Sequence, residues 1–353
     1  MHPAQQPADA AIHASLTTKE GWRRFVDDVP APPALLARSQ REQLDPVERA
    51  GYQEHRLSYH ARLIIVATPM IRQVVATGRR LVLLNRHQLS ARRGLIVTGP
   101  AATGKTTAIS QLGKHHELAV RRRDPTAHAR LPVVYVTVPP AATPRMLAAE
   151  FARFLGLPTS RRQNQAEITN QVCDLLCQLH VDLVLVDELH NISLATRAGA
   201  EASDQLKYLS ERIPATFVLA GIDLEHVGLF SGTRGRQIAS RFTTVPASPF
   251  AYGTKPQRQQ WRALVATLEE ALRLHDHKPG SLLRLDRYLQ ERTGGMIGSL
   301  SHLLRGAAID AIQDGTEKVT KATLERITID HAAQTQTATW AAGTRAQRRR
   351  RAG

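Results

Sequence analysis

The run from Gly99 to Thr106 has the residue types and spacing of a phosphate-binding loop. It matches G-x-x-x-x-G-K-[ST] without a mismatch and reads Gly99, Pro100, Ala101, Ala102, Thr103, Gly104, Lys105, Thr106. Such loops turn backbone N–H groups onto phosphate oxygens, while the lysine reaches the β and γ phosphates and the final hydroxyl ligates Mg²⁺. We therefore expect these residues and Thr107 to bind a nucleoside triphosphate, with Lys105 also serving catalysis and Thr106 holding the metal.

A pair of carboxylates follows another apolar run further along the chain. Asp187 and Glu188 come directly after four apolar residues. Because the carboxyl ends of parallel strands share one edge of a sheet, Asp187 is expected to hold Mg²⁺ near the phosphate loop. Glu188 can orient and deprotonate an attacking water, so the pair favours hydrolysis over binding alone. For His190 and Asn191, a packing or turn role is favoured over a catalytic one.

Two arginines precede the last strand expected in this region. Arg241 comes just before that strand, and Arg236 lies shortly upstream. A cation opposite the γ phosphate stabilises the charge that develops during phosphoryl transfer. Arg241 is the first candidate for an arginine finger supplied to a neighbouring subunit, and Arg236 is the second. A solvated surface arginine is the alternative.

Strands and helices alternate between residue 94 and about residue 246, which predicts the sheet that positions these residues. The apolar runs are continuous, as is typical of parallel strands buried on both faces. Expected strands cover residues 94–98, 132–138, 181–186 and 216–220, with a fifth after Arg241. The fold class is therefore a doubly wound parallel α/β sheet.

Helical patterns replace strands after Pro246 and predict a small all-helical second domain. The expected organisation is an N-terminal extension over residues 1–60, a nucleotide-binding α/β domain over 61–250, a helical lid over 251–335 and a basic, disordered tail over 336–353. The extension alternates Pro-containing stretches with short amphipathic pieces. It is expected to wrap the main domain or to dock a partner.

Composition describes a globular chain with an unusual charge. The sequence has 47 Lys and Arg against 31 Asp and Glu, a net charge of +16. This excess indicates a polyanionic partner or a coding bias toward arginine. Cys173 and Cys177 lack the further ligands of a zinc site and are expected in the core of a reduced protein. Without a membrane-length apolar run or a signal-peptide pattern, a cytoplasmic location without membrane contact is expected.

In this order, the motifs resemble those of the TniB-type AAA+ ATPases, a family related to TnsC and MuB. The resemblance spans about residues 60–335 and rests on the phosphate loop, Asp187-Glu188-Leu189-His190-Asn191, Ser240-Arg241-Phe242 and Gly294-Gly295-Met296-Ile297-Gly298. It implies an AAA+ P-loop NTPase fold followed by a helical lid. It also implies ATP and Mg²⁺ as cofactors and slow ATP hydrolysis that DNA or a partner stimulates.

The resemblance further implies a regulator of transposition. Such proteins assemble on double-stranded DNA as rings or filaments, mark the target, recruit a transposase and disassemble on hydrolysis, with a TniQ-like adaptor as a further partner. The loops that would face DNA carry Arg145, Thr159, Arg161 and Arg162. Contacts through them would be sequence-nonspecific and salt-sensitive. Solvated loop charges are the alternative.

Two positions depart from the pattern of the resembled family. Ile222 stands where a polar sensor of the γ phosphate is common, and Gly298 stands where many AAA+ proteins place a sensor arginine. Reliance on Arg241 and slow hydrolysis are therefore expected, with Arg305 as a weaker substitute.

Two rival functions stay open at this point. One is a helicase loader or replication initiator, and the short stretch after residue 333 argues against the added winged-helix domain that initiators carry. The other is a nucleotide-gated scaffold or signalling switch, against which Glu188 counts because such a switch needs no general base.

Overall fold

The computed structural model describes residues 15–125, 130–194, 196–224 and 240–329, which fall into two compact units. The first unit draws on Met1–Asp28, Pro69–Pro100 and Lys105–Ala247, and the second on Val29–Thr68, Ala101–Gly104 and Ser248–Gly353. The segment expected to form one N-terminal extension is thus divided: its first part belongs to the sheet-containing unit, and its second part groups with the C-terminal helices.

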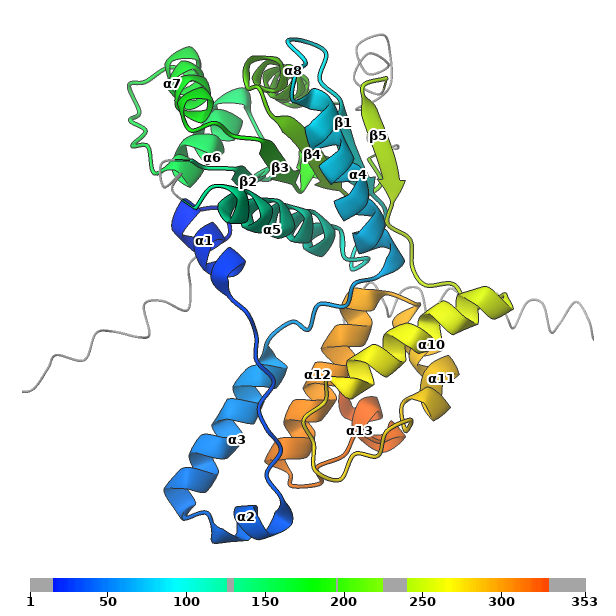
Figure 1. The fold of residues 1–353 in the computed structure, drawn as a ribbon. Helices are drawn as coiled ribbons and strands as arrows, with labels where there is room; N and C mark the ends of the chain where they lie inside the picture. The colour runs from blue at the N-terminus through cyan, green and yellow to red at the C-terminus, as the bar shows by residue number, and fades with distance from the viewer. Residues whose placement is uncertain (1–14, 126–129, 195, 225–239, 330–353) are drawn as a thin grey trace, which may run out of the picture. The chain divides into compact units, whose positions relative to one another are not determined.

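A five-stranded parallel sheet forms the centre of the first unit (Figure 1). Its strands are β1 (Gly94–Thr98), β2 (Val133–Thr137), β3 (Leu183–Asp187), β4 (Thr216–Gly221) and β5 (Phe242–Pro246), in the order β2-β3-β4-β1-β5. Strands β1, β3 and β4 are buried along their whole length, whereas β5 at the edge exposes several residues. The predicted parallel sheet is therefore confirmed, and its continuous apolar runs reflect burial on both faces.

Two groups of helices accompany this sheet (Figure 1). The helices are α1 (Lys19–Asp27), α4 (Pro69–Asn85), α5 (Lys105–Arg123), α6 (Pro144–Leu155), α7 (Gln165–Gln178) and α8 (Arg197–Arg212), with the short η2 (Leu189–Asn191) after β3. Helix α5 packs on α4 and on the central strands, while α6 packs on α7, α8 and β2. In α7, Cys173 is buried in the core, and both cysteines are free thiols.

Trp22 anchors helix α1 to the first unit. Its side chain is fully buried and stacks on Tyr135 of β2, with ring centroids 6.0 Å apart and an interplanar angle of 11°. The indole N–H donates to the buried carboxylate of Glu117 in α5. Gly113 makes room for this ring, because a Cβ there would lie 2.6 Å from the indole. Trp22 is thus a packing residue rather than a platform for base stacking.

The second unit contains helices and no strand among its described residues. Its elements are α2 (Arg38–Gln43), α3 (Pro46–Ala61), α10 (Lys255–Glu270), η3 (Leu283–Leu285), α11 (Asp286–Thr293), α12 (Ile297–Gln313) and α13 (Lys321–Arg326). Helix α3 packs along α12. Trp261 of α10 lies fully buried in the apolar core of this unit. No described helix combines the length and apolar character needed to cross a lipid bilayer.

A buried ion pair fixes α3 within the second unit. The Arg56 guanidinium donates to both carboxylate oxygens of Glu317, at 2.7 and 2.8 Å. Burial alone would raise the pKa of Glu317, but the bonds from Arg56 and from the His275 amide lower it overall. One turn along α3, the Nε2 of buried His60 accepts a hydrogen bond from the Arg273 amide at 3.2 Å.

Acid is expected to destabilise this unit through His60. Burial, followed by repulsion from Arg56 and Arg273, lowers the pKa of His60 from 6.5 to about 4. The unfolded chain therefore binds more protons than the folded chain between these values, and stability falls as pH drops through that window. The loss in the free energy of unfolding amounts to about 3 kcal/mol.

His60→Gln keeps an acceptor without titrating, so in urea unfolding at several pH values its free energy of unfolding should depend less steeply on pH. His55→Gln, on the exposed side of α3, should retain the wild-type slope, and equal slopes in all three proteins would refute the assignment.

Candidate nucleotide site

The phosphate loop connects the end of β1 to the start of α5, and its shape depends on glycine. Gly99 has φ +150°, and a Cβ there would lie 2.0 Å from the carbonyl oxygen of Ala247. Gly104 also has a positive φ, +89°. These positions keep the backbone open where N–H groups must approach an anion.

Lys105 is held over this loop by backbone oxygens. Its Nζ donates to the carbonyl oxygens of Gly99 at 2.8 Å and Pro100 at 2.6 Å. Burial lowers the pKa of Lys105, although the nearby carboxylates Asp187 and Glu188 act to raise it. A desolvated ammonium beside open backbone N–H groups is suited to bind phosphate oxygens.

The two residues expected to hold Mg²⁺ are in direct contact. The Thr106 hydroxyl donates to Asp187 Oδ2 at 2.6 Å, and the Asp187 side chain is almost completely buried. Among the described residues, no group of three or more His, Cys, Asp or Glu side chains could hold a metal. Mg²⁺ typically takes one or two protein oxygens and completes its shell with phosphates and waters. This hydroxyl and carboxylate fit such a site.

Tyr135 is a partner of this site that sequence reasoning missed. Its hydroxyl donates to the same Asp187 Oδ2 at 2.8 Å, while the Glu188 amide donates to Oδ1 at 2.8 Å. Burial, reinforced by Asp187, raises the pKa of Tyr135, so the phenol stays a donor. The available signal was one tyrosine within an otherwise valine-rich strand next to β3. Together with Thr106, these donors fix the Asp187 carboxylate.

Glu188 leaves the strand in a left-handed conformation. Its φ is +56°, which is unusual for a residue with a side chain and turns the chain immediately after Asp187. The Glu188 side chain is 44% exposed, and its Oε2 lies 3.2 Å from Nε2 of His190. A carboxylate that contacts an imidazole at one oxygen and is open to solvent can accept a proton from water.

The structure shows the surroundings of the two positions that depart from the expected sensor pattern. Ile222 follows β4, and its amide donates to Nδ1 of His190 at 3.3 Å. Within the second unit, the Gly298 amide donates to the Ala102 carbonyl at 2.9 Å, and a Cβ on Gly298 would lie only 3.0 Å from that oxygen. A larger side chain at Gly298 would disturb this close approach. Arg305 instead donates to the last carbonyls of α3.

Arg241 lies at the edge of the sheet opposite the phosphate loop. Its carbonyl accepts from the Gly94 amide, at the start of β1, and Phe242 pairs with Gly94 in the parallel register. The loop follows the other end of β1, about 16 Å away along a five-residue strand. Arg241 therefore lies too far from the phosphate loop of its own chain to contact a nucleotide bound there. Arg236, the second candidate, lies outside the described residues.

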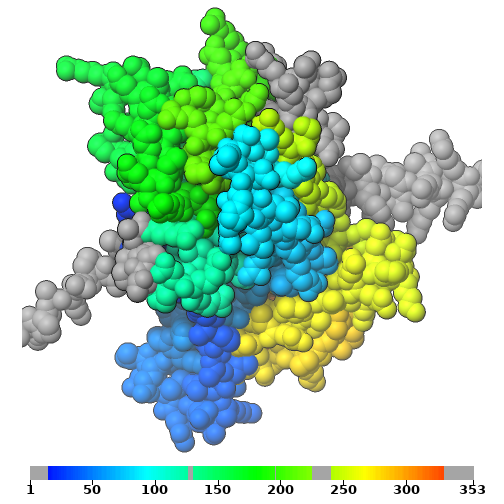
Figure 2. Space-filling view, turned by 45° about the horizontal axis from the view of Figure 1, so that its top comes forward, coloured from blue at the N-terminus to red at the C-terminus, as the bar shows by residue number. Residues whose placement is uncertain are grey.

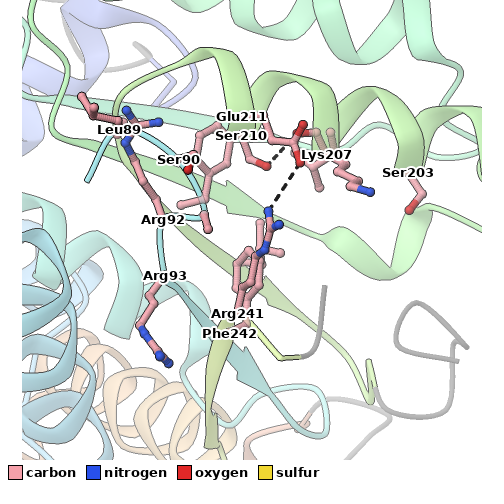
Figure 3. A pocket seen from close by; sticks show the side chains of 16 residues that line it. Leu89, Ser90, Arg92, Arg93, Ser203, Lys207, Ser210, Glu211, Arg241 and Phe242 are labelled. Atoms are coloured by element: carbon pink, nitrogen blue, oxygen red, sulfur yellow. Dashed lines mark hydrogen bonds and ion pairs between the residues drawn. The ribbon is translucent and has the colours of Figure 1, made fainter. Parts of the chain in front are cut away.

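Arg241 lines a cavity of about 320 Å³. The segment after α4 and helix α8 lie side by side around it (Figure 2). Figure 3 shows Arg241 pointing toward Glu211 of α8, and the two charges lie 3.4 Å apart. Both side chains are about half exposed, and such pairs contribute little to stability. A stronger anion can therefore displace Glu211 from the guanidinium.

The expected DNA-facing residues lie around the loop between α6 and α7. Arg145 donates to the carbonyls of Ser160 and Gln163, so it braces this loop. Arg161 and Arg162 are exposed on it, and Thr159 is exposed just before them. The structure thus brings these four residues together. Arg145 stabilises the loop through its hydrogen bonds, whereas Arg161 and Arg162 are exposed to solvent.

Comparison with known proteins assigns the chain to a family. The family model for the bacterial TniB protein matches residues 62–252, more than half of the chain. The chain belongs to the TniB family. A search of curated proteins found no match for this TniB chain.

Solved structures with the same fold include two archaeal proteins. One is the Aeropyrum pernix ORC1 protein in complex with DNA, with 16% identity and a TM-score of 0.55 over 79% of this chain and 67% of that chain. Another is the Aeropyrum pernix ORC2 protein in ADPNP and ADP complexes, with 17% identity and a TM-score of 0.55 over 75% and 68%. At this identity the likeness establishes the fold alone. The TniB chain therefore has an AAA+ ATPase fold, as predicted.

Proposed function

We propose that this TniB protein is an ATP-dependent, DNA-binding regulator of transposition. It would oligomerise on double-stranded DNA, mark a target and recruit a transposase, directly or through a TniQ-like adaptor, and ATP hydrolysis would drive its disassembly. The observation that carries the proposal is the contact of Thr106 with Asp187 beneath a glycine-dependent phosphate loop, in a chain of the TniB family.

The proposal assigns a role in binding or hydrolysis to each residue of the site. Lys105 binds the β and γ phosphates, and Thr106 and Asp187 hold Mg²⁺, which when bound neutralises charge on the phosphate oxygens. Tyr135 and the Glu188 amide keep the Asp187 carboxylate oriented. Glu188 orients the attacking water and accepts its proton.

Assembly would complete the site. Arg241 lies at the end of β1 opposite the phosphate loop of its own subunit, so in a ring or filament it would act on the γ phosphate of a neighbour. The weak pair with Glu211 keeps the guanidinium at the surface until that phosphate replaces the carboxylate. This arrangement makes hydrolysis depend on assembly.

Sedimentation with long duplex DNA tests the proposed function. Wild-type protein with ATP should co-sediment with the DNA as a large assembly, and protein with ADP should not. If the protein stays monomeric with ATP in both the presence and the absence of DNA, the assembly proposal is wrong. Stable assembly without turnover would favour the nucleotide-gated scaffold instead.

The exposed arginines of the α6–α7 loop are expected to contact DNA phosphates. Replacing Arg161 and Arg162 with alanine should weaken binding to any duplex sequence and reduce the slope of log affinity against log salt by about 2. Fluorescence anisotropy at several salt concentrations measures both effects. The matched control replaces Arg284 and Arg287, which are exposed in the second unit, with alanine. An equal loss in both double variants would show a general charge effect instead of a contact.

A further inference from the structure

We propose that His190 positions the Glu188 carboxylate for hydrolysis and ties it to the backbone at the end of β4. This inference rests on the proposed ATPase function and deepens it. It gives a role in the reaction to a residue for which the sequence favoured local packing.

The contacts of the two ring nitrogens define the tautomer of the imidazole. Nδ1 lies 3.3 Å from the amide nitrogen of Ile222, and Nε2 lies 3.2 Å from Oε2 of Glu188. An amide N–H can only donate, so Nδ1 must be an unprotonated acceptor. The neutral ring then carries its proton on Nε2, the nitrogen that lies next to the Glu188 carboxylate. Both neighbours therefore favour the same tautomer.

The short helix η2 that carries His190 is fixed at several points. Leu189 is buried in the core, and Asn191 donates its side-chain N–H to the Val138 carbonyl at 2.8 Å. Gly221 lets β4 approach closely, because a Cβ there would lie 3.1 Å from the His190 amide nitrogen. A rigid helix turn therefore holds the imidazole, which is only 24% exposed, against a more exposed glutamate.

This arrangement gives the apolar position 222, directly after β4, a link to the site. The position of Ile222 offers its backbone amide instead, and His190 carries that contact to Glu188. With the imidazole next to Oε2, Oε1 of Glu188 is left to accept a proton from water. An exposed glutamate has several side-chain rotamers and would lose this conformational entropy on reaching the transition state. Fixing one rotamer beforehand removes that cost from the barrier.

Three substitutions at His190 separate its two contacts. His190→Ala removes both and should lower kcat for ATP hydrolysis about 10-fold or more, with KM for ATP changed less than about 3-fold. In His190→Gln, an amide N–H can take the place of Nε2–H and should restore most of kcat. In His190→Asn, the shorter side chain can accept from Ile222 but not reach Glu188, and kcat should stay low. His87→Ala, at an exposed position, is the matched control.

The second readout is the combination with Glu188→Gln. Because His190 acts through Glu188, His190→Ala should reduce the residual rate of Glu188→Gln less than about 2-fold. Thermal melting and binding of a fluorescent ATP analogue identify variants that merely unfold. Wild-type kcat in His190→Ala, or equal recovery by Gln and Asn, would overturn this inference and leave the proposed function intact. A wild-type protein that hydrolyses no ATP would overturn the proposed function and this inference with it.

Discussion

Lys105→Ala is expected to abolish ATP binding, with an affinity loss of more than about 100-fold. Hydrogen bonds from a charged group are worth up to about 3 kcal/mol each, and this ammonium is pre-placed at the loop by two carbonyl oxygens. An alanine leaves the phosphates without their lysine partner in a site that is already desolvated. Titration with a fluorescent ATP analogue or calorimetry measures the loss.

The control for this variant is Lys318→Ala, which removes the same charge from an exposed position in the second unit. It should bind ATP like the wild type. The melting temperature of Lys105→Ala without nucleotide should stay close to the wild-type value, since its loss is in binding. If Lys105→Ala binds ATP within about 5-fold of the wild type, the phosphate-loop assignment is wrong.

Glu188→Gln should have the opposite phenotype. The glutamine keeps the size of the side chain but cannot accept a proton, so hydrolysis should fall about 100-fold or more. ATP binding should persist, because Lys105, Thr106 and Asp187 are unchanged. Assemblies on DNA should therefore form and then fail to disassemble. Phosphate release together with sedimentation over time measures both effects.

Glu54→Gln, at an exposed position of α3, supplies the matched control and should hydrolyse ATP at the wild-type rate. The two site variants also test each other. Loss of binding in Glu188→Gln combined with retained binding in Lys105→Ala would reverse the roles assigned to these residues.

The sheet could be predicted from the sequence because strands that are buried on both faces have continuous apolar runs. Runs such as residues 94–98 and 216–220 are apolar without alternation, and both form buried strands. The phosphate loop could also be predicted from the sequence. Its backbone conformation and close backbone contact require glycine, and few other residues can replace it.

Contacts between distant segments could not be predicted in this way. Tyr135 meets Asp187 only because β2 and β3 pair in one register, and Trp22 reaches Tyr135 from far upstream. The link from His190 to Ile222 likewise depends on how η2 packs against β4. Such contacts arise from the tertiary arrangement and leave no spacing or periodicity in the sequence.

The division of the N-terminal segment was hidden for a related reason. Helix α3 has a polar surface by composition, and its place beside α12 depends on the buried pair of Arg56 and Glu317. An arginine and a glutamate so far apart in the sequence give no sign that they meet. Arg145 is a similar case. An arginine in this loop could bind loop carbonyls or DNA phosphates, and the sequence alone does not show that it binds the carbonyls.

If assembly on DNA completes the nucleotide site, the rate of phosphate release depends on the length of the duplex. The rate should be measured at saturating ATP without DNA, with a duplex too short to hold two subunits, and with long duplex DNA. Release should be slow in the first two conditions, and the long duplex should stimulate it clearly in the wild type but not in Arg241→Ala. The same rate in all three conditions, or stimulation that persists in Arg241→Ala, would contradict this expectation.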